Sequence, residues 1–167
     1  MKRLAVYPGS FDPITNGHTD LVKRGLKMFD EIIILIATNP DKTSLFSVEE
    51  RLEMIREIYK DNERVKVDSY PGLLVDYLKQ CEANIIFRGL RALSDFEYEF
   101  QMALTNRKLN KDIETIFMMP KETYSYISSR LIKEAVSLGA NVRAFVPPFI
   151  ERELKKKLLG QYTSRKA

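Results

Sequence analysis

The sequence predicts an α/β fold in which one parallel sheet of five strands carries helices on both faces. Runs of strand length alternate with longer segments of helical period along the chain. The runs at 32–37 (IIILIA) and 85–87 (IIF) are continuously apolar, which is typical of parallel strands buried on both faces. With 44% hydrophobic residues, a chain of 167 residues can bury one core. Residues 1–167 are therefore expected to form a single doubly wound, Rossmann-like domain.

Each element is expected from its local pattern. Strands are expected at 3–8, 31–38, 64–70, 84–89 and 114–120. Helices are expected at 16–29, 48–59, 73–81, 96–109 and 128–138. Ser47 and Glu50 form a capping box ahead of the second helix, and Phe96, Phe100 and Leu104 lie on one apolar stripe of the fourth. A basic helix and tail at about 147–167 are expected as a C-terminal appendage.

Charge and cysteine content limit the partners and the cellular compartment that are expected for the protein. The net charge of +4 and the pI of 9.1 favour anionic partners: nucleic acid, an acidic membrane surface or small phosphorylated ligands. Because Cys81 is the only cysteine, no intrachain disulfide can form, and a reduced setting is expected. The longest apolar run is far below the roughly 20 residues that span a bilayer, and the first residues lack a secretory pattern. We therefore expect a cytoplasmic protein with no membrane partner.

The segment after the first strand is the first candidate for a ligand site. In open parallel sheets, ligands bind beyond the carboxyl ends of the strands, near the point where the strand order reverses. Residues 9–18 (GSFDPITNGH) follow the first strand and contain the chain's only histidine, His18, at a helix start. The free N–H groups of a helix N-terminus attract anions. We expect Ser10 and His18 to contact phosphate oxygens; the alternative for His18 is a surface or capping residue.

Three cations follow other strands. Arg88 ends a strand that should be interior, where an unpaired charge is costly, so it needs an anionic partner. Arg91 offers a second guanidinium fork, which matches phosphate geometry. Salt bridges to Asp95, Glu97 or Glu99 are the alternative for both arginines. Lys42, after the second strand, can clamp a phosphate as a point charge or can be an ordinary exposed loop lysine.

The remaining polar residues suit phosphate chemistry more than covalent catalysis. Ser128 and Ser129 stand at a predicted helix start, where one serine suffices for capping and two can cradle a phosphate. The sequence has no zinc-binding cluster, no GxxxxGK[ST] loop and no GxGxxG fingerprint, and Cys81 is expected in the core. Donors and cations without a nucleophile indicate phosphate transfer by positioning and charge stabilisation.

Three motifs closely resemble those of bacterial phosphopantetheine adenylyltransferases, a family of the nucleotidyltransferase superfamily with a [T/H]xGH motif. They are 8–18 (PGSFDPITNGH), 88–91 (RGLR) with 95–99 (DFEYE) downstream, and 124–133 (YSYISSRLIK). The resemblance covers nearly the full chain. It implies transfer of the adenylyl group of ATP to 4'-phosphopantetheine by direct in-line displacement, with Mg2+ accompanying the nucleotide. It also implies a homohexamer that coenzyme A inhibits.

The resemblance also assigns roles to residues of this chain. Ser10, Lys42 and Arg88 would hold the phosphate of phosphopantetheine, and Leu74 would contact its pantetheine arm. His18 would stabilise the charge that develops at the α-phosphate. Arginine at position 130 departs from the serine or threonine usual in the family. Nucleotide contacts are implied for Ser10, Phe11, His18, Gly89, Leu90, Arg91, Glu99, Tyr124, Ser125, Tyr126, Ile127, Ser128, Ser129 and Arg130.

Other functions compete with this interpretation. Another adenylyl or cytidylyl transferase of the superfamily, for example one that acts on nicotinamide mononucleotide, would carry the same [T/H]xGH chemistry. A nucleic-acid-binding protein would use the basic surface, but the aromatic residues are not interleaved with basic ones as stacking platforms would be. A nucleotide sensor would bind ATP without releasing pyrophosphate. We expect no nucleic-acid partner.

Overall fold

The computed structural model describes residues 2–37 and 43–164, except for the side chains of 93–94 and 160–164. One parallel sheet lies at its centre, with the strand order β3-β2-β1-β4-β5. The order reverses between β1 and β4, which makes the ends of these two strands the place where a ligand is expected. The parallel five-stranded sheet predicted from the sequence is confirmed. The strands are β1 (Leu4–Gly9), β2 (Glu31–Ala37), β3 (Val65–Tyr70), β4 (Ile85–Gly89) and β5 (Glu114–Met118).

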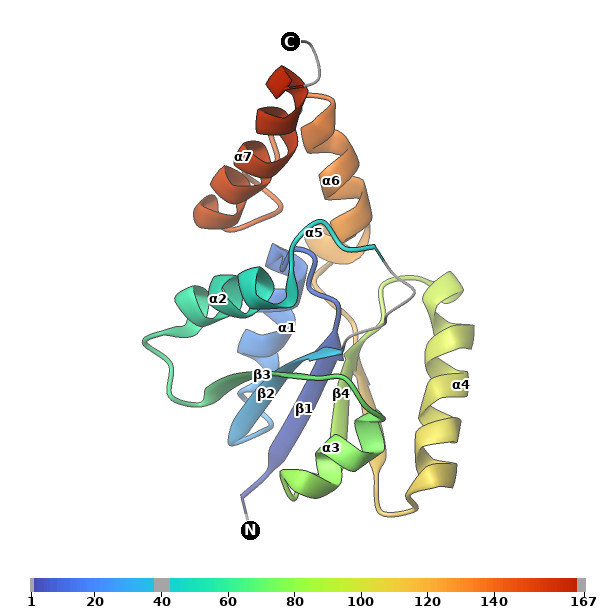
Figure 1. Ribbon diagram of the computed structural model, residues 1–167. Helices are drawn as coiled ribbons and strands as arrows, with labels where there is room; N and C mark the ends of the chain where they lie inside the picture. The colour runs from blue at the N-terminus through green and yellow to red at the C-terminus, as the bar shows by residue number, and fades with distance from the viewer. Residues whose placement is uncertain (1, 38–42, 165–167) are drawn as a thin grey trace.

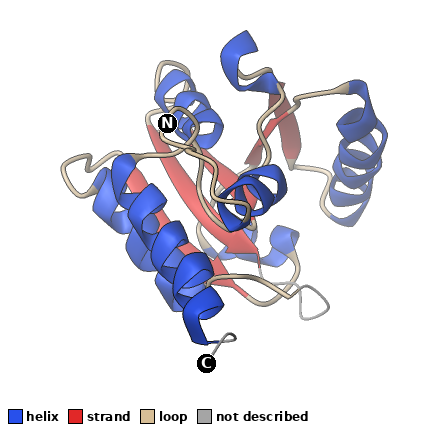
Figure 2. Cartoon of the chain, turned by 90° about the horizontal axis from the view of Figure 1, so that it is seen from above, coloured by secondary structure: helices blue, strands red, loops and turns tan. Residues whose placement is uncertain are grey.

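Helices cover both faces of the sheet, as Figure 2 shows from above. Alternate residues of β1 explain the two layers: Ala5 and Tyr7 pack into a cluster with α1 and α2, whereas Val6 faces the opposite side with α3. The carboxyl end of β1 points toward α5 and α6 (Figure 1). The helices are α1 (Asn16–Gly25), α2 (Val48–Tyr59), α3 (Leu74–Gln80), α4 (Leu93–Leu109), α5 (Glu122–Ser125), α6 (Ser129–Ser137) and α7 (Pro148–Ser164).

The expected helices are present, and apart from small shifts at other helix ends three differences stand out. The first helix ends at Gly25 instead of residue 29, because the chain turns there: the N–H groups of Met28 and Phe29 both donate to the Gly25 carbonyl. The fourth helix begins three residues earlier than expected, at Leu93. The single turn of α5 was not expected, because four residues are too few for a helical period to show in a sequence.

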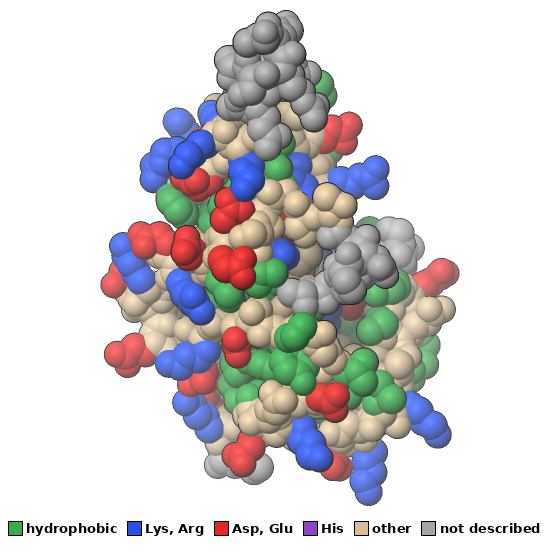
Figure 3. Space-filling model, in the orientation of Figure 1, with side chains coloured by type: hydrophobic (Ala, Val, Ile, Leu, Met, Phe, Trp, Pro, Cys, Tyr) green, Lys and Arg blue, Asp and Glu red, His purple; other side chains and the backbone are tan. Residues whose placement is uncertain are grey.

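The apolar stripe of α4 faces outward. Phe96, Phe100 and Leu104 are 44%, 46% and 48% exposed, and the two phenylalanine rings stack on each other with centroids 5.5 Å apart. In Figure 3, apolar side chains are visible along the right-hand side, where Figure 1 places α4. The stripe correctly predicted a helix, but this chain alone does not bury it.

The expected C-terminal appendage contains α7, which packs against α6 at one end of the molecule (Figure 1). Ile132 and Val136 of α6 pack against Ile150 and Leu154 of α7, and this contact continues the larger core cluster. The pair is thus joined to the sheet by apolar burial as well as by the chain. In the part of the chain that the structure describes, none of the helices has the length and apolar character needed to cross a membrane.

Candidate active site

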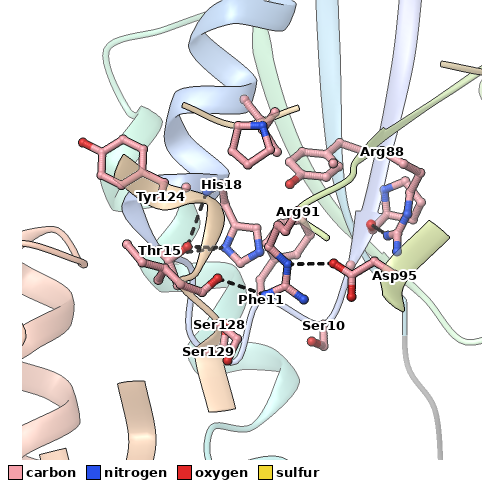
Figure 4. A pocket seen from close by; sticks show the side chains of 18 of the residues that line it. Ser10, Phe11, Thr15, His18, Arg88, Arg91, Asp95, Tyr124, Ser128 and Ser129 are labelled. Atoms are coloured by element: carbon pink, nitrogen blue, oxygen red, sulfur yellow. Dashed lines mark hydrogen bonds and ion pairs between the residues drawn. The ribbon is translucent and has the colours of Figure 1, made fainter. Parts of the chain in front are cut away.

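A cavity of about 410 Å³ opens where the strand order reverses. The ends of β1 and β4, the first turn of α1 and the α5–α6 segment meet around it. In Figure 4, His18, Arg91, Ser10 and Ser128 gather around one space. We call this the first cavity. The predicted site residues that line it are Ser10, Phe11, His18, Arg88, Gly89, Arg91, Glu99, Tyr124, Ile127, Ser128, Ser129 and Arg130.

The other predicted site residues do not line the first cavity. Leu90, Ser125 and Tyr126 are absent from its wall, and the Ser125 hydroxyl donates to the carbonyl of Glu122. Leu74 begins α3 and packs against the core cluster on the opposite face of the sheet. Lys42 lies outside the described residues, so its role as a phosphate clamp stays a prediction.

His18 is held by the capping box of α1. The Thr15 backbone N–H donates to His18 Nδ1 at 3.0 Å, and the His18 N–H donates to the Thr15 hydroxyl oxygen at 3.4 Å. Because Nδ1 accepts a hydrogen bond, the proton of the neutral ring is on Nε2. Capping and ligand contact, which the sequence offered as alternatives for His18, are therefore compatible: Nδ1 caps the helix, and Nε2–H can donate to a ligand.

The surroundings of His18 keep its ring neutral. Burial, together with the positive charges of Arg91 and Arg88, lowers the pKa of His18 to about 3. The rings of Phe11 and Tyr7 lie beside it, with Phe11 edge-on at a centroid distance of 5.1 Å. At neutral pH, His18 can thus act as a fixed hydrogen-bond donor without carrying a charge of its own.

This low pKa predicts that stability depends on pH through His18. Unfolded, the ring takes up a proton as the pH falls below about 6.5; folded, it does so only near 3. Between these values the unfolded state binds more protons, so the free energy of unfolding decreases as the pH falls. We expect wild type to lose about 1 kcal/mol more than His18→Asn between pH 8 and pH 5.5, measured by urea unfolding. Equal losses in the two proteins would contradict a lowered pKa.

Arg88 is paired within the chain. Its guanidinium forms a two-bond ion pair with the carboxylate of Glu99 on α4 and also donates to the carbonyl of Pro8. The need for an anionic partner, predicted from its position at a strand end, is met by Glu99. Both residues also line the first cavity, so the salt bridge and the ligand contact do not exclude each other.

Arg91 is positioned in a similar way. Its Nε donates to Asp95 at 3.1 Å, and Nη1 donates to the carbonyl of Ile127 at 2.9 Å. Figure 4 shows the contact between Arg91 and Asp95 as a dashed line. Asp95 itself was considered from the sequence only as a salt-bridge partner, but it lines the first cavity. Arg88 and Arg91 therefore lie in one wall of the cavity, and the carboxylates of Glu99 and Asp95 orient their guanidinium groups.

Ser128 and Ser129, at the start of α6, form different hydrogen bonds. The Ser128 hydroxyl caps α6 by accepting from the N–H of Leu131 at 3.1 Å. The Ser129 hydroxyl donates to the carbonyl of Pro13 at 2.8 Å and so ties this helix start to the loop after β1. The predicted helix start is confirmed, and it lies beside the loop that carries Ser10.

Two glycines lie in close packing around the cavity. A Cβ on Gly9 would lie 2.9 Å from the ring of Phe11, and one on Gly89 would lie 2.4 Å from Leu21 Cδ1. At Gly17 of the TNGH motif, a Cβ would meet Tyr124 at an ordinary 3.5 Å. The protein itself therefore leaves room at position 17, and the space that this glycine leaves open belongs to the cavity.

Sequence reasoning missed Asp12, a buried carboxylate that joins three segments of the site. It accepts the N–H groups of Leu45 and Phe46 at 3.0 and 2.9 Å and the ammonium group of Lys133 at 2.5 Å. Burial alone would raise the pKa of Asp12, but these hydrogen bonds outweigh burial and hold it below its usual value. Asp12 thus fixes the loop after β1, the loop before α2 and α6 in one arrangement. Its place in a turn-rich loop gave no periodic signal.

Comparisons with known proteins identify the class. A profile of the cytidylyltransferase-like family matches residues 6–135. A structure described as a nicotinate-nucleotide adenylyltransferase from Vibrio parahaemolyticus superposes with a TM-score of 0.66 at 17% identity, over 92% of this chain and 99% of that one. This likeness supports the fold alone. Together with the first cavity, the family match defines a nucleotidyltransferase.

Two curated relatives narrow the class. The phosphopantetheine adenylyltransferase of Syntrophus aciditrophicus is 58% identical over 94% of this chain and 95% of its own length. That of Dictyoglomus turgidum is 53% identical over 92% and 96%. The chain belongs to the phosphopantetheine adenylyltransferase family.

Proposed function

We propose that this chain transfers the adenylyl group of ATP to 4'-phosphopantetheine by direct in-line displacement, giving dephospho-coenzyme A and pyrophosphate. The first cavity carries the proposal: a neutral histidine donor, two arginines and a serine helix start surround one space at the strand switch point. No covalent nucleophile is needed, because phosphoryl-type transfer relies on positioning and charge stabilisation.

His18 acts on the reacting phosphate. An oxygen of the phosphopantetheine phosphate attacks the α-phosphorus, a new P–O bond forms there, and the bond to the β-phosphate's bridging oxygen breaks. Negative charge grows on the α-phosphate oxygens during this step. The Nε2–H of His18, whose direction the Thr15 contact fixes, donates to one of them.

The remaining residues hold the two substrates. Arg91 and the Ser128–Ser129 helix start bind the β- and γ-phosphates of ATP, since a guanidinium fork and free helix N–H groups both suit phosphate oxygens. Ser10, Arg88 and Lys42 bind the phosphate of phosphopantetheine, and Leu74 contacts its pantetheine arm. Support for the first assignment is that Arg91, Ser128 and Ser129 share the wall of the first cavity with His18.

When bound to the triphosphate of ATP, Mg2+ would neutralise part of its charge. Asp95 and Glu99 line the first cavity, and each is paired with an arginine. Across the described side chains, no three His, Cys, Asp or Glu residues gather in a way that could hold a metal ion. These pairings favour a metal held by the nucleotide's phosphates.

Pyrophosphate release tests this function. We expect release from ATP with 4'-phosphopantetheine and none with ATP alone. Nicotinamide mononucleotide in place of phosphopantetheine distinguishes another transferase of the superfamily, and ATP binding without any release would indicate a nucleotide sensor. Pyrophosphate release from ATP with nicotinamide mononucleotide, but not with 4'-phosphopantetheine, would contradict the proposal.

Assembly, regulation and location belong to the same proposal. We propose that the chain forms a homohexamer and that it acts in the cytoplasm. We also propose that coenzyme A, which is chemically similar to the product, inhibits it. The exposed stripe of Phe96, Phe100 and Leu104 on α4 supports self-association, because a second copy of the chain can bury it. Light scattering should give about six times the chain mass of 19.4 kDa.

A further inference from the structure

Arg51 is a buried arginine that the proposed mechanism does not use. It lies on α2 and is 5% exposed. Nη1 donates to the carbonyl of Ser10 at 2.7 Å and Nε donates to the carbonyl of Ser47 at 3.1 Å. In the described ranges, 2–37 and 43–164, no carboxylate forms an ion pair with it. Glu49 on the same helix interacts electrostatically with Arg51, but both hydrogen bonds of the guanidinium go to carbonyl groups. A buried guanidinium without a hydrogen-bonded carboxylate favours an anion nearby.

Arg51 lines a second cavity of about 1070 Å³. This second cavity adjoins the first: Ser10, Ser129 and Arg130 line both. Lys157 reaches it from α7, where its ammonium group contacts Glu50 at 2.6 Å and lies 5.6 Å from the ring centre of Phe46. The C-terminal appendage thus contributes a cation to the edge of the active site.

The described wall of the second cavity has more positive than negative side chains. Its two carboxylates, Asp12 and Glu50, are each neutralised by a lysine. Arg51 and Arg130 have no such partner among the described residues. The cations in this wall are Arg51, Arg130, Lys133 and Lys157. Four cations against two carboxylates leave an excess of two positive charges, which suits a multiply charged anion.

We propose that the second cavity binds inorganic diphosphate, the leaving group of the adenylyl transfer. The inference rests on the proposed function, in which the β- and γ-phosphates lie against Arg91 and the Ser128–Ser129 helix start before the reaction, and Ser129 also lines the second cavity. Once the bond to the α-phosphorus has broken, these two phosphates form a free diphosphate that is no longer tethered to the nucleoside. It moves past the shared wall toward Arg51 and Lys157, while the adenylyl product stays in the first cavity.

Lys157→Met tests the second cavity without disturbing the buried Arg51. Lys156→Met is the matched control: it removes the same charge from the next residue, whose side chain is 81% exposed and points to Glu153. Calorimetry would measure the Kd of sodium diphosphate and of α,β-methylene-ATP for wild type and both variants. We expect Lys157→Met to weaken diphosphate binding about fivefold, because it removes a cation and leaves Glu50 unpaired. The analogue should bind within about twofold of wild type.

Two further titrations identify the anion. Lys157→Arg should restore diphosphate binding, because it keeps the positive charge. Unchanged diphosphate binding in Lys157→Met, or an equal loss in Lys156→Met, would overturn the proposal. A larger loss for 4'-phosphopantetheine than for diphosphate would also overturn it, since the second cavity would then hold the acceptor's phosphate. Diphosphate binding is measured without an acceptor, so failure of the proposed function would appear separately, as absent turnover with phosphopantetheine.

Discussion

Replacing His18 by alanine is expected to lower kcat about 100- to 1000-fold, because a donor aimed at transition-state charge contributes about 2.7–4 kcal/mol. The Kd of ATP should change little, since the Nε2–H contact strengthens only as charge develops. The variant also loses the acceptor for the Thr15 N–H, which should cost about 1 kcal/mol of stability. Single-turnover kinetics and urea unfolding measure the two effects.

His18→Asn separates catalysis from capping. The asparagine side-chain oxygen lies at the same distance along the side chain as Nδ1, so it can accept the Thr15 N–H and restore the cap. It has no group at the position of Nε2. We therefore expect stability close to wild type with turnover as low as in His18→Ala. Near-normal turnover of His18→Asn would remove the Nε2 donor from the mechanism.

The fold could be predicted to a large extent because buried positions produce a periodic pattern of apolar residues in the sequence. The continuous run at 32–37 predicted an interior strand, and β2 is covered on both faces. The order of the strands could not be obtained in this way, because pairing depends on which edges meet in space. The exposed stripe of α4 shows the same limit, since a period identifies a helix face but not its partner.

The site was predictable where a residue ends a strand or begins a helix. His18, Arg88 and Ser128 stand at such ends, and all line the first cavity. Arg51 was missed because it lies inside a helix, where arginine is usually solvated. One signal could have revealed it: positions 48, 51 and 55 follow helical spacing, which places Arg51 on the face of α2 that packs inward.

The largest expected effect on both stability and substrate binding comes from Arg88→Met. Glu99, whose side chain is 11% exposed, would lose its partner and remain as a buried charge. Breaking such a pair costs about 3–5 kcal/mol, and the remaining exposure favours the lower value. The Kd of phosphopantetheine should rise about 10- to 100-fold, because a charged hydrogen bond contributes about 1.5–3 kcal/mol. The Kd of ATP should rise less.

The double variant Arg88→Met/Glu99→Gln distinguishes the structural role of Arg88 from its role in substrate binding. Without a charge at position 99 no unpaired carboxylate remains, so most of the lost stability should return while phosphopantetheine binding stays weak. Arg107→Met is the control, because its pair with Glu114 is more than half exposed on both sides and should contribute less than about 1 kcal/mol. If the double variant regained phosphopantetheine affinity together with stability, Arg88 would act on the substrate only by holding Glu99 and the loop after β1. If the double variant regains stability but its affinity for phosphopantetheine stays low, the guanidinium of Arg88 itself contacts the phosphate. The ion pair with Glu99 then positions Arg88 for that contact.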